Sequence, residues 1–504
     1  MSIGEYARRE NLFGVLAIVI SGLVVVLANR SGVSWSWDST DYVAAGRSLA
    51  EFKGSLDVSG APMTVRPPGY PFLISLGELL NAPTNITLLV INVASAIVTT
   101  GCVYVVVKRC AFVTTAVLAA SFIALTPTML WQTSMAWSEP PYVAVMMVAF
   151  VVVIWHTGRT RFIVLGCLYV ALFFLRFVGP VFIAPLVVIG ILVDKRTSRW
   201  AKAVGLHAIT LGTSIIPMVW WLMRNRRIDG TLTGARQAGG GTFWETTTHA
   251  FGTYGSFLTG QPFDSVIYER VTDYPIAAQV AAVVVAGVLL ASIAFASHDA
   301  RLHQLAPSDR QIVVLASIGL VIAYTAFSAY RFVHLEIGRL DTRMMMPLLP
   351  ALVVITSLTV ERIVASRRSI ARGVLVASIA LTAIHSFVTL RDASRFGEDQ
   401  RHLSNAVNRN LDLHVYVRSL GDDSALYSNA PQMLFLSADT WPIFTPWQVG
   451  TPWPGDCTRR YAVYYNDFQV QDNRPTTAQV LYEDPTGTVY DVGACSEDIN
   501  LAWD

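Results

Sequence analysis

Residues 84–107 read TNITLLVINVASAIVTTGCVYVVV, a stretch without a charged side chain that indicates the fold of the chain. A helix needs about 20 mostly apolar residues to cross the roughly 30 Å hydrocarbon core of a membrane. Lys108 and Arg109 follow directly, and positive charge after an apolar run is typical of the cytoplasmic side of a membrane. The stretch therefore predicts a transmembrane helix that ends in the cytoplasm.

Apolar runs of similar length recur along most of the chain. Of the 504 residues, 53% are hydrophobic and 14% are charged, whereas a soluble globular protein carries about 25% charged residues. This composition excludes a soluble globular protein and a disordered chain. We predict a mostly α-helical, polytopic membrane protein with eleven transmembrane helices, at residues 11–29, 84–107, 112–130, 141–156, 161–175, 178–193, 203–222, 276–297, 311–330, 344–361 and 372–390.

Basic residues lie in alternate predicted loops, and the positive-inside rule gives the chain an orientation. The N-terminus is predicted to be cytoplasmic, and an odd number of spans then puts the C-terminal tail outside the plasma membrane. Ala28–Asn29 loosely resembles a signal-peptide cleavage site, but we interpret the first run as an uncleaved anchor. The loops assigned to the cytoplasm contain Arg8 and Arg9, Lys108 and Arg109, Arg159 and Arg161, residues 195–202, Arg301 and Arg310, and residues 362–372.

The charge distribution divides the chain into two domains. Residues 1–390 form the membrane body and have a net charge of +10, whereas residues 391–504 have a net charge of −8. Short alternating apolar segments at 425–427, 462–465 and 489–492, with helical spacing at 403–417, predict a small α/β domain outside the membrane. Cys457 and Cys495 both lie in this tail, where an oxidising compartment would allow a disulfide between them.

Several arginines fall in the loops that should face outward, against the positive-inside rule. Something should compensate for their charge, and a bound anion such as a lipid phosphate would do so. Pairing with Asp229, Glu336 or Asp341, or with lipid headgroups, is the alternative. These residues are Arg66, Arg176, Arg224, Arg226, Arg227, Arg331, Arg339 and Arg343.

Two outward segments are too long to be simple connectors. In residues 30–83, Tyr42, Ala45, Leu49 and Phe52 share one helical face, and Asp38 could cap this helix. The turn at 67–69 then precedes a second amphipathic helix at 72–80, so the segment predicts two helices on the membrane surface. Residues 223–275 are rich in Gly and Thr around 239–242, and they suit a mobile lid and a disordered loop equally well.

Three acidic residues suit chemistry at the outer membrane boundary. Asp38 and Asp41 are three positions apart, so on a helix they share a face. Glu139 precedes Pro140–Pro141, and an acid with proline at a helix start is also an ordinary feature of helix starts. Helix capping by Asp38 is a structural alternative of the same kind. Each residue alone therefore leaves the functional and the structural interpretation open.

The order of these residues along the chain resembles the GT-C glycosyltransferase superfamily, which includes the aminoarabinose transferase of lipid A and the protein O-mannosyltransferases. The family pattern has an acid after the first span, then an amphipathic helix and a basic residue before Pro-Pro. One departure is Ser39, because many relatives have Asp-Glu at the first site. The matching motifs are Asp38-x-x-x-Tyr42, Arg66–Pro67–Pro68–Gly69–Tyr70–Pro71, Ser138–Glu139, Leu175–Arg176, Arg224–Asn225, and Asp341-x-Arg343 with Pro347 and Pro350.

The resemblance implies transfer of a sugar from a polyprenyl phosphate to an acceptor at the outer membrane surface, with inversion. It implies Asp38 as the general base, with Asp41 as a second candidate, because a carboxylate can take the proton of an acceptor hydroxyl. Arginines would hold the lipid phosphate by bidentate donation. The expected site residues are Asp38, Asp41 and Glu139 for catalysis, Arg66, Arg224, Arg343, Arg176 and Arg339 for the donor phosphate, and Tyr42, Tyr70 and Trp244 for the substrate wall.

The sequence leaves the sugar, the acceptor and the oligomeric state open. A glycan, glycolipid or protein acceptor would fit, and the Ala-, Val- and Arg-rich composition suits a high-GC bacterium with a cell-envelope arabinan or mannan. No cofactor is assigned, although Asp38, Asp41 and Glu139 could hold a divalent metal ion. No nucleic-acid partner and no nucleotide fingerprint are indicated. A transporter or flippase for lipid-linked sugars and a non-catalytic lipid-binding protein are the alternatives.

Overall fold

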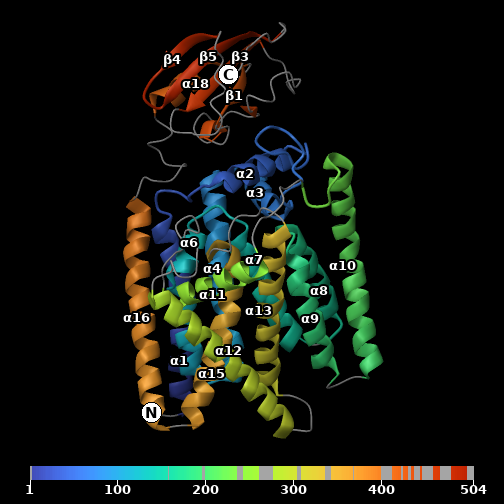
Figure 1. The fold of residues 1–504 in the computed structure, drawn as a ribbon, viewed down its shortest axis with the longest axis vertical. Coiled ribbons are helices and arrows are strands. Elements are labelled where there is room, and N and C mark those ends of the chain that lie inside the picture. Colours follow the sequence, from blue (N-terminus) through green and yellow to red (C-terminus); the bar gives the residue numbers. More distant parts are fainter. Residues whose placement is uncertain are drawn as a thin grey trace.

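Long apolar helices run side by side through most of the computed structural model (Figure 1). The structure describes residues 3–156, 158–195, 199–234, 242–259, 276–302, 308–334, 342–366, 368–398, 411–421, 424–429, 433–435, 443–444, 458–465 and 478–495. The helices of the bundle are α1 (Ile3–Ala28), α4 (Thr84–Cys110), α5 (Val113–Ala124), α6 (Pro127–Thr133), α7 (Glu139–Trp155), α8 (Thr160–Leu175), α9 (Gly179–Asp194), α10 (Trp200–Asp229), α12 (Ile276–Leu302), α13 (Asp309–His334), α14 (Thr342–Met345), η2 (Met346–Leu348), α15 (Leu349–Ser366) and α16 (Arg368–Glu398).

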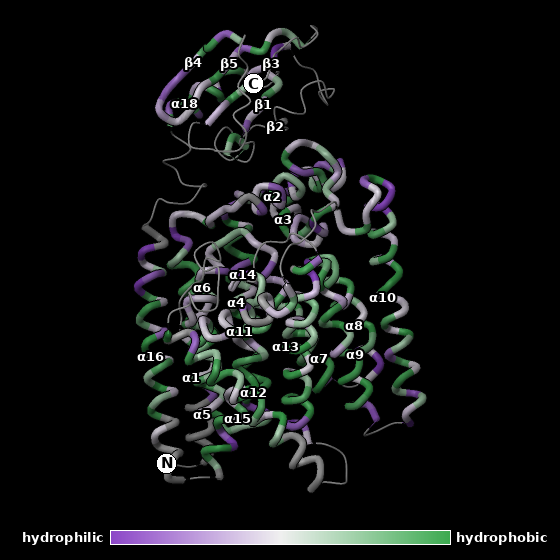
Figure 2. Tube along the Cα trace, in the orientation of Figure 1, coloured by the Kyte–Doolittle hydropathy of each residue, from purple (hydrophilic) through white to green (hydrophobic). Residues whose placement is uncertain are grey.

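The predicted spans coincide with these helices, and the chain is a multi-pass membrane protein. Each predicted apolar run falls on one helix or on consecutive helices of the bundle. Apolar residues follow the lengths of the helices, and hydrophilic residues gather near their ends (Figure 2). Within the described residues, five helices are long and apolar enough to cross a membrane, or six if α5 and α6 form one span. The count of eleven spans therefore stays a prediction.

The predicted span at 112–130 is not a single straight helix. α5 ends at Ala124, and α6 begins at Pro127 after a bend of 48°. A residue before proline avoids the helical region, and Thr126 accordingly has an extended backbone, with φ −86° and ψ 133°. Pro127 thus explains the break between α5 and α6, which the continuous apolar run does not indicate.

The first long loop contains the two predicted helices, α2 (Trp37–Ala50) and α3 (Gly69–Leu79), which pack on each other across one end of the bundle (Figure 1). Two details of the prediction are wrong. The N-cap of α2 is Ser36, whose backbone N–H donates to the Ser39 hydroxyl at 2.9 Å, so Asp38 lies in the first turn with its carboxylate directed elsewhere. Phe52 lies beyond the end of α2 with φ +60° and is 89% exposed, so it is not on the buried face.

The second long loop is more ordered than either interpretation predicted. α10 continues to Asp229 and ends at Gly230, which has the positive φ of +79° that glycine adopts readily. Residues Phe243–Thr259 form helix α11, which packs against α12 and α13 within the bundle. Tyr254 and Phe257 are buried on its inner face. Part of the segment is therefore a packed helix, while residues 235–241 and 260–275 lie outside the described part of the chain.

The C-terminal tail forms the predicted small α/β domain. Its described elements are α18 (Asp412–Arg418), β1 (Ser424–Ser428), β2 (Ile443–Phe444), β3 (Arg459–Tyr465), β4 (Gln479–Glu483) and β5 (Gly487–Ala494). The strand order is β2-β1-β3-β5-β4. β1 is parallel to β2 and β3, and β5 is antiparallel to β3 and β4. The predicted strands at 425–427, 462–465 and 489–492 fall within β1, β3 and β5.

The C-terminal domain lies beyond the end of the bundle that carries α2 and α3, while α1 begins at the opposite end (Figure 1). This arrangement agrees with termini on opposite sides of the membrane, although which side is outside stays a prediction. Cys495 is disulfide-bonded, and Cys102, Cys110 and Cys167 are free. Cys457, its predicted partner, lies outside the described residues.

Candidate active site

A short backbone pairing brings the segments before α2 and α7 together. Ser34 forms an isolated parallel bridge with Met135. The Ser34 N–H donates to Ser134 O, and the Ala136 N–H donates to Ser34 O, both at 2.8 Å. Asp38 and Glu139 each lie four residues beyond the bridged pair. The start of α2 and the start of α7 are thus held side by side, with one carboxylate on each.

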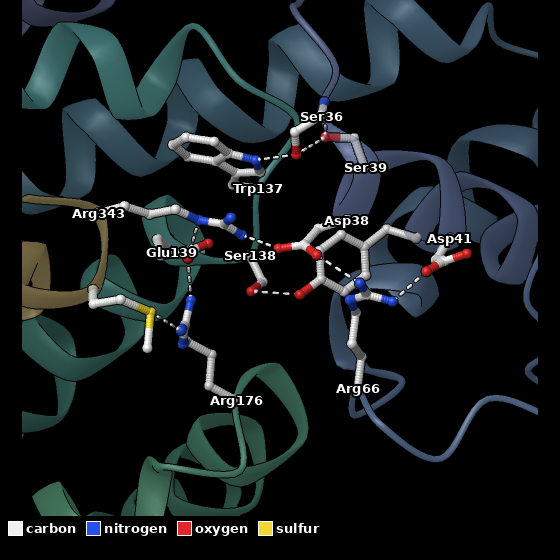
Figure 3. A network of polar contacts seen from close by, with 12 residues as sticks. Ser36, Asp38, Ser39, Asp41, Arg66, Trp137, Ser138, Glu139, Arg176 and Arg343 are labelled. Carbon is white, nitrogen blue, oxygen red and sulfur yellow. Dashed lines mark hydrogen bonds and ion pairs between the residues drawn. The ribbon is translucent and has the colours of Figure 1, made fainter. Parts of the chain in front are cut away.

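Arg66 joins the two acidic residues of α2. Its Nη2 donates to Asp38 Oδ1 at 2.5 Å, and its Nη1 pairs with Asp41 Oδ2 (Figure 3). The shared face predicted for Asp38 and Asp41 is therefore confirmed. Arg66 stands at the turn before α3, where Pro67 and Pro68 prevent the helix from starting earlier. Its guanidinium also lies over the Tyr42 ring, 5.6 Å from the ring centroid.

Arg343 connects Asp38 to Glu139 from the other side of the cluster (Figure 3). Its Nε donates to Glu139 Oε1 at 2.8 Å, and its Nη2 pairs with Asp38 Oδ2. Arg176, at the end of α8, pairs with the same Glu139 oxygen. The Arg343 guanidinium also lies 4.1 Å from the centroid of the Trp137 ring. Six charged residues therefore form one network, and Asp41 lies at its edge, where it pairs with Arg66.

Glu139 is the buried centre of this network. Its side chain is 0% exposed, whereas those of Arg176 and Arg343 are 16% and 20% exposed. A buried carboxylate requires paired charges, because desolvation is otherwise too costly. The two arginines supply that pairing, and in return Glu139 fixes the position of both guanidiniums.

Asp38 and Asp41 have opposite pKa shifts although they share Arg66. Burial acts to raise the pKa of Asp38, but the positive charges of Arg343 and Arg66 outweigh burial, and its pKa lies below the ordinary value. Burial raises the pKa of Asp41 above its ordinary value, because Arg66 alone opposes it and Asp57 and Asp38 add negative charge nearby. Asp38 is therefore the more firmly ionised of the two carboxylates.

A cavity of about 340 Å³ opens beside this network. Asp38 lines it from one side, and residues from α8, α13 and α14 line it from others. Asp41 and Glu139 do not line the cavity, but the arginines with which they form ion pairs do. The charged or hydroxyl-bearing lining residues are Asp38, Tyr42, Arg66, Ser138, Arg176, Tyr324, Ser328, Arg331 and Arg343.

Arg331 is the charged lining residue that the sequence did not assign to the site, and Ser138, Tyr324 and Ser328 were not assigned to it either. Arg331 had been grouped only with the other outward-facing arginines, because its place near the end of α13 is also usual for a charge at the membrane boundary. Its Nη2 is buried without a hydrogen-bond partner among the described residues. Its guanidinium lies 6.0 Å from the centroid of the Phe327 ring. The basic residue at the end of an apolar run was the signal that could have identified it.

The aromatic residues expected at the substrate wall have different positions. Tyr42 lines the cavity, and its hydroxyl lies 3.2 Å from that of Ser138. Tyr70 is buried behind it, with an edge-to-face contact of 5.1 Å between the ring centroids. Trp244 is 74% exposed near the start of α11 and is not part of the cavity lining.

Arg224 lies in a separate apolar groove of about 470 Å³ between α3, α8 and α10. Its Nη1 donates to Met63 O at 3.1 Å and to Asn225 Oδ1 at 3.0 Å. Its guanidinium lies 4.4 Å from the centroid of the Trp221 ring. Groove and cavity adjoin, because Pro67 lines the cavity and Pro68 lines the groove. The structure thus does not bring Arg224 to the carboxylates, and Arg339 and Asp341 lie outside the described residues.

The carboxylates are poorly suited to hold a metal ion as they stand. Asp38, Asp41 and Glu139 each form an ion pair with at least one arginine, and a divalent cation prefers carboxylates whose oxygens are available as ligands. Among the described residues, no group of three or more His, Cys, Asp or Glu side chains could hold a metal ion. The arrangement instead suits acid–base chemistry by Asp38 next to a bound anion.

Solved structures share this fold, although sequence comparisons find nothing. No protein-family model matches the chain, and no curated protein matches it. ArnT from Cupriavidus metallidurans in the apo state is 13% identical, with a TM-score of 0.63 over 95% of this chain and 97% of ArnT. The same ArnT bound to undecaprenyl phosphate is 13% identical, with a TM-score of 0.61 over 97% of this chain and 98% of ArnT.

The arabinofuranosyltransferase AftD from mycobacteria is a more distant match. It is 14% identical, with a TM-score of 0.46, and the alignment covers 96% of this chain but 42% of AftD. The ArnT match extends over both the membrane body and the C-terminal domain, because it covers nearly all of each chain. It agrees with the GT-C architecture that the sequence motifs predicted. The chain therefore has the fold of ArnT along almost its entire length.

Proposed function

We propose that the chain is a glycosyltransferase that moves a sugar from a polyprenyl-phosphate donor to an acceptor at the outer face of the plasma membrane. The observation that carries this proposal is the cavity in which the Asp38 carboxylate lies between the guanidiniums of Arg66 and Arg343. The ionised carboxylate can accept the proton of an acceptor hydroxyl, and the fixed cations can stabilise the charge on the departing phosphate. The fold shared with ArnT, which binds undecaprenyl phosphate, supports the choice of donor.

Asp38 is the general base in this proposal. It is the carboxylate that lines the cavity, so an acceptor hydroxyl there could come within hydrogen-bond distance of it. The acceptor oxygen attacks the anomeric carbon as its proton passes to Asp38, and the sugar–phosphate bond breaks with its electron pair on the phosphate oxygen. One direct displacement of this kind inverts the anomeric carbon. No covalent intermediate with the enzyme is required.

Glu139 and Asp41 are positioning residues in this scheme. Glu139 holds Arg176 and Arg343, and Asp41 holds Arg66. Preorganised guanidiniums stabilise the charge that grows on the leaving phosphate without having to move during the reaction. Arg224 has a different role, since it lies in the adjoining apolar groove. That groove, lined by Phe72, Phe174, Trp220 and Trp221, suits the first part of the polyprenyl chain.

The acceptor is proposed to be a glycan, glycolipid or protein of the cell envelope. Asp38 and Tyr42 of the cavity belong to α2, which lies at the end of the bundle that faces the C-terminal domain (Figure 1). The basic loops assigned to the cytoplasm lead us to propose that this end is outside. An arabinosyl or mannosyl transfer is consistent with the composition of the chain. The Arg47 guanidinium of α2 lies 5.3 Å from the centroid of the Phe435 ring in the C-terminal domain, so we propose that this domain contributes to acceptor binding.

The decisive experiment gives purified protein a set of radiolabelled polyprenyl-phosphate sugars with a membrane extract as acceptor. Release of polyprenyl phosphate together with a labelled product is the expected result. Asp38→Asn should be inserted and folded normally but should lose transfer by about a hundredfold or more, because general-base help is worth that much. Glu51→Gln is the control, because Glu51 is an exposed acid of the same loop.

Other outcomes would identify another function. Uptake of the lipid-linked sugar into vesicles without release of polyprenyl phosphate would indicate a carrier. Binding without release or uptake would indicate a lipid-binding protein. Full transfer by Asp38→Asn would leave an enzyme but would remove Asp38 as its base.

A further inference from the structure

Trp137 lies beside the charged network, between the bridged segment at Met135 and the start of α7. It is 4% exposed and is not one of the residues that line the cavity. Its indole Nε1–H donates to Ser36 Oγ at 2.6 Å (Figure 3). Ser36 is the N-cap of α2 and stands two residues before Asp38. Trp137 is therefore attached to the start of the helix that carries the proposed base.

The ring of Trp137 also contacts Arg343. The guanidinium carbon of Arg343 lies 4.1 Å from the centroid of the indole ring. An aromatic ring attracts a cation through the negative charge of its face, most strongly when the ring is tryptophan and the site is removed from water. Trp131 packs edge-on against the same indole, with 5.0 Å between the ring centroids. A hydrogen bond and a packed neighbour thus fix the ring that Arg343 contacts.

The contacts of Arg343 with the ring and with the carboxylates are of different kinds. Its Nε donates to Glu139 Oε1 at 2.8 Å, and its Nη2 pairs with Asp38. These contacts use the N–H donors of the guanidinium, whereas an interaction with an aromatic face uses none of them. The indole therefore restricts the position of Arg343 without competing for its hydrogen bonds.

We propose that Trp137 is a positioning residue that holds Arg343 against Asp38 during transfer. This inference rests on the proposed glycosyl transfer and adds a residue from outside the cavity to it. When Asp38 takes the proton of the acceptor hydroxyl, its negative charge disappears and Arg343 loses one of its two ionic partners. The indole has no charge to lose, so its contact with Arg343 persists through this step. Arg343 thus remains in place until Asp38 releases the proton.

The position of Arg343 in turn affects the protonation of Asp38. Burial raises the pKa of Asp38, and the positive charges of Arg343 and Arg66 more than offset burial. A displaced Arg343 would let this pKa rise, so less of the base would be ionised as the pH falls. The other described titratable groups near Asp38 are Asp41, Tyr42 and Glu139.

The test compares kcat per folded protein between about pH 5 and pH 8 for the natural chain, Trp137→Leu and Trp137→Phe. Trp137→Leu removes the ring and its hydrogen bond, and kcat should fall by about 10- to 100-fold with little change in KM. The loss should be larger at pH 5 than at pH 8. Trp137→Phe keeps an aromatic face and should recover part of kcat. Trp155→Leu should resemble the natural chain, because Trp155 contacts Arg109 at the other end of α7.

A second background shows whether Trp137 acts through Arg343. In Arg343→Gln, the further change Trp137→Leu should reduce kcat little, because the contact is already absent. A loss that is the same at every pH, or equally large in the Arg343→Gln background, would show a merely structural role and overturn the proposal. Unchanged kcat in Trp137→Leu would overturn it too. Where Trp137→Leu does not fold, Trp137→Phe takes its place in the same comparison.

Failure of the proposed function would give a different result. The natural chain would then release no polyprenyl phosphate from any donor. Thermal unfolding of Trp137→Leu, Arg343→Gln and the double variant would still measure the contact. Losses of Tm that do not add would show that Trp137 holds Arg343, whereas additive losses would show that it does not.

Discussion

At the scale of single residues, the pairing of Asp38 determines its titration. Arg343 and Arg66 lower its pKa despite burial, so the carboxylate stays ionised well into the acid range. A lowered folded-state pKa contributes stability that is present above the ordinary value of 3.8 and is lost as the pH falls below it. Asp41 behaves in the opposite way, because its raised pKa means that its ionised form destabilises the fold at neutral pH.

Thermal unfolding as a function of pH tests this account of Asp38. The difference in Tm between the natural chain and Asp38→Asn should be constant from pH 7 to pH 5, because Asp38 remains ionised across that range. The difference should shrink only below about pH 4, where an ordinary aspartate becomes protonated in the unfolded chain. A difference that already shrinks between pH 7 and pH 5 would show that the arginines do not control this carboxylate.

The residues of the site were predictable to different degrees. The spacing of Asp38 and Asp41 and the arginine before Pro-Pro were sufficient to group three residues correctly. Arg224 lies apart from the carboxylates because α10 extends beyond its apolar run to Asp229, and the longer helix keeps Arg224 in the adjoining groove. Trp244 lies outside the cavity lining because its segment, which the sequence suggested to be a loop, forms helix α11 and leaves its ring exposed.

At the scale of secondary-structure elements, the contact between the turn before α3 and the end of α8 determines the spacing of the site. A Cβ on Gly69 would lie 2.4 Å from the backbone oxygen of Phe174, so only glycine allows the two segments to meet. Arg66 is three residues before this contact and Arg176 is two residues after it. The distance between the two guanidiniums thus depends on a backbone contact, which apolar periodicity cannot reveal.

Replacement of Gly69 by alanine tests the importance of this contact. The added methyl group would push the Arg66 turn away from α8, and misplacement of fixed groups by about 1 Å can reduce turnover by about 100-fold. We expect a large loss of kcat with the protein still inserted and folded. Gly212→Ala is a suitable comparison, because a Cβ on Gly212 would meet open space and its backbone is helical. Equal activity of Gly69→Ala and the natural chain would show that the site tolerates displacement of the Arg66 turn from α8.

At the scale of the whole molecule, the apolar runs predicted the bundle and the charge distribution predicted a separate C-terminal domain. Both features depend on composition over many residues, so a local error in a helix end does not affect them. The break between α5 and α6 and the presence of α11 were less predictable. Proline geometry decides the first, and packing against α12 and α13 decides the second.

The orientation of the molecule is open to a direct measurement. A reporter that is active only outside the membrane, such as alkaline phosphatase, should be active when fused after residue 504 and inactive when fused at the N-terminus. A reporter that fluoresces only in the cytoplasm should give the reverse pattern. Activity of the alkaline phosphatase at the N-terminus would invert the orientation and move the arginine cluster to the cytoplasmic side.

The ion pair between Asp38 and Arg343 joins residues that are 305 positions apart. At about 5–20 residues per second of synthesis, roughly 15–60 s separate the appearance of the two side chains. During that interval Glu139 also lacks one of its two arginines. The proposed catalytic centre is therefore completed late in biogenesis, after α13 has been made, and a chain that stalls in the membrane before that point lacks this ion pair.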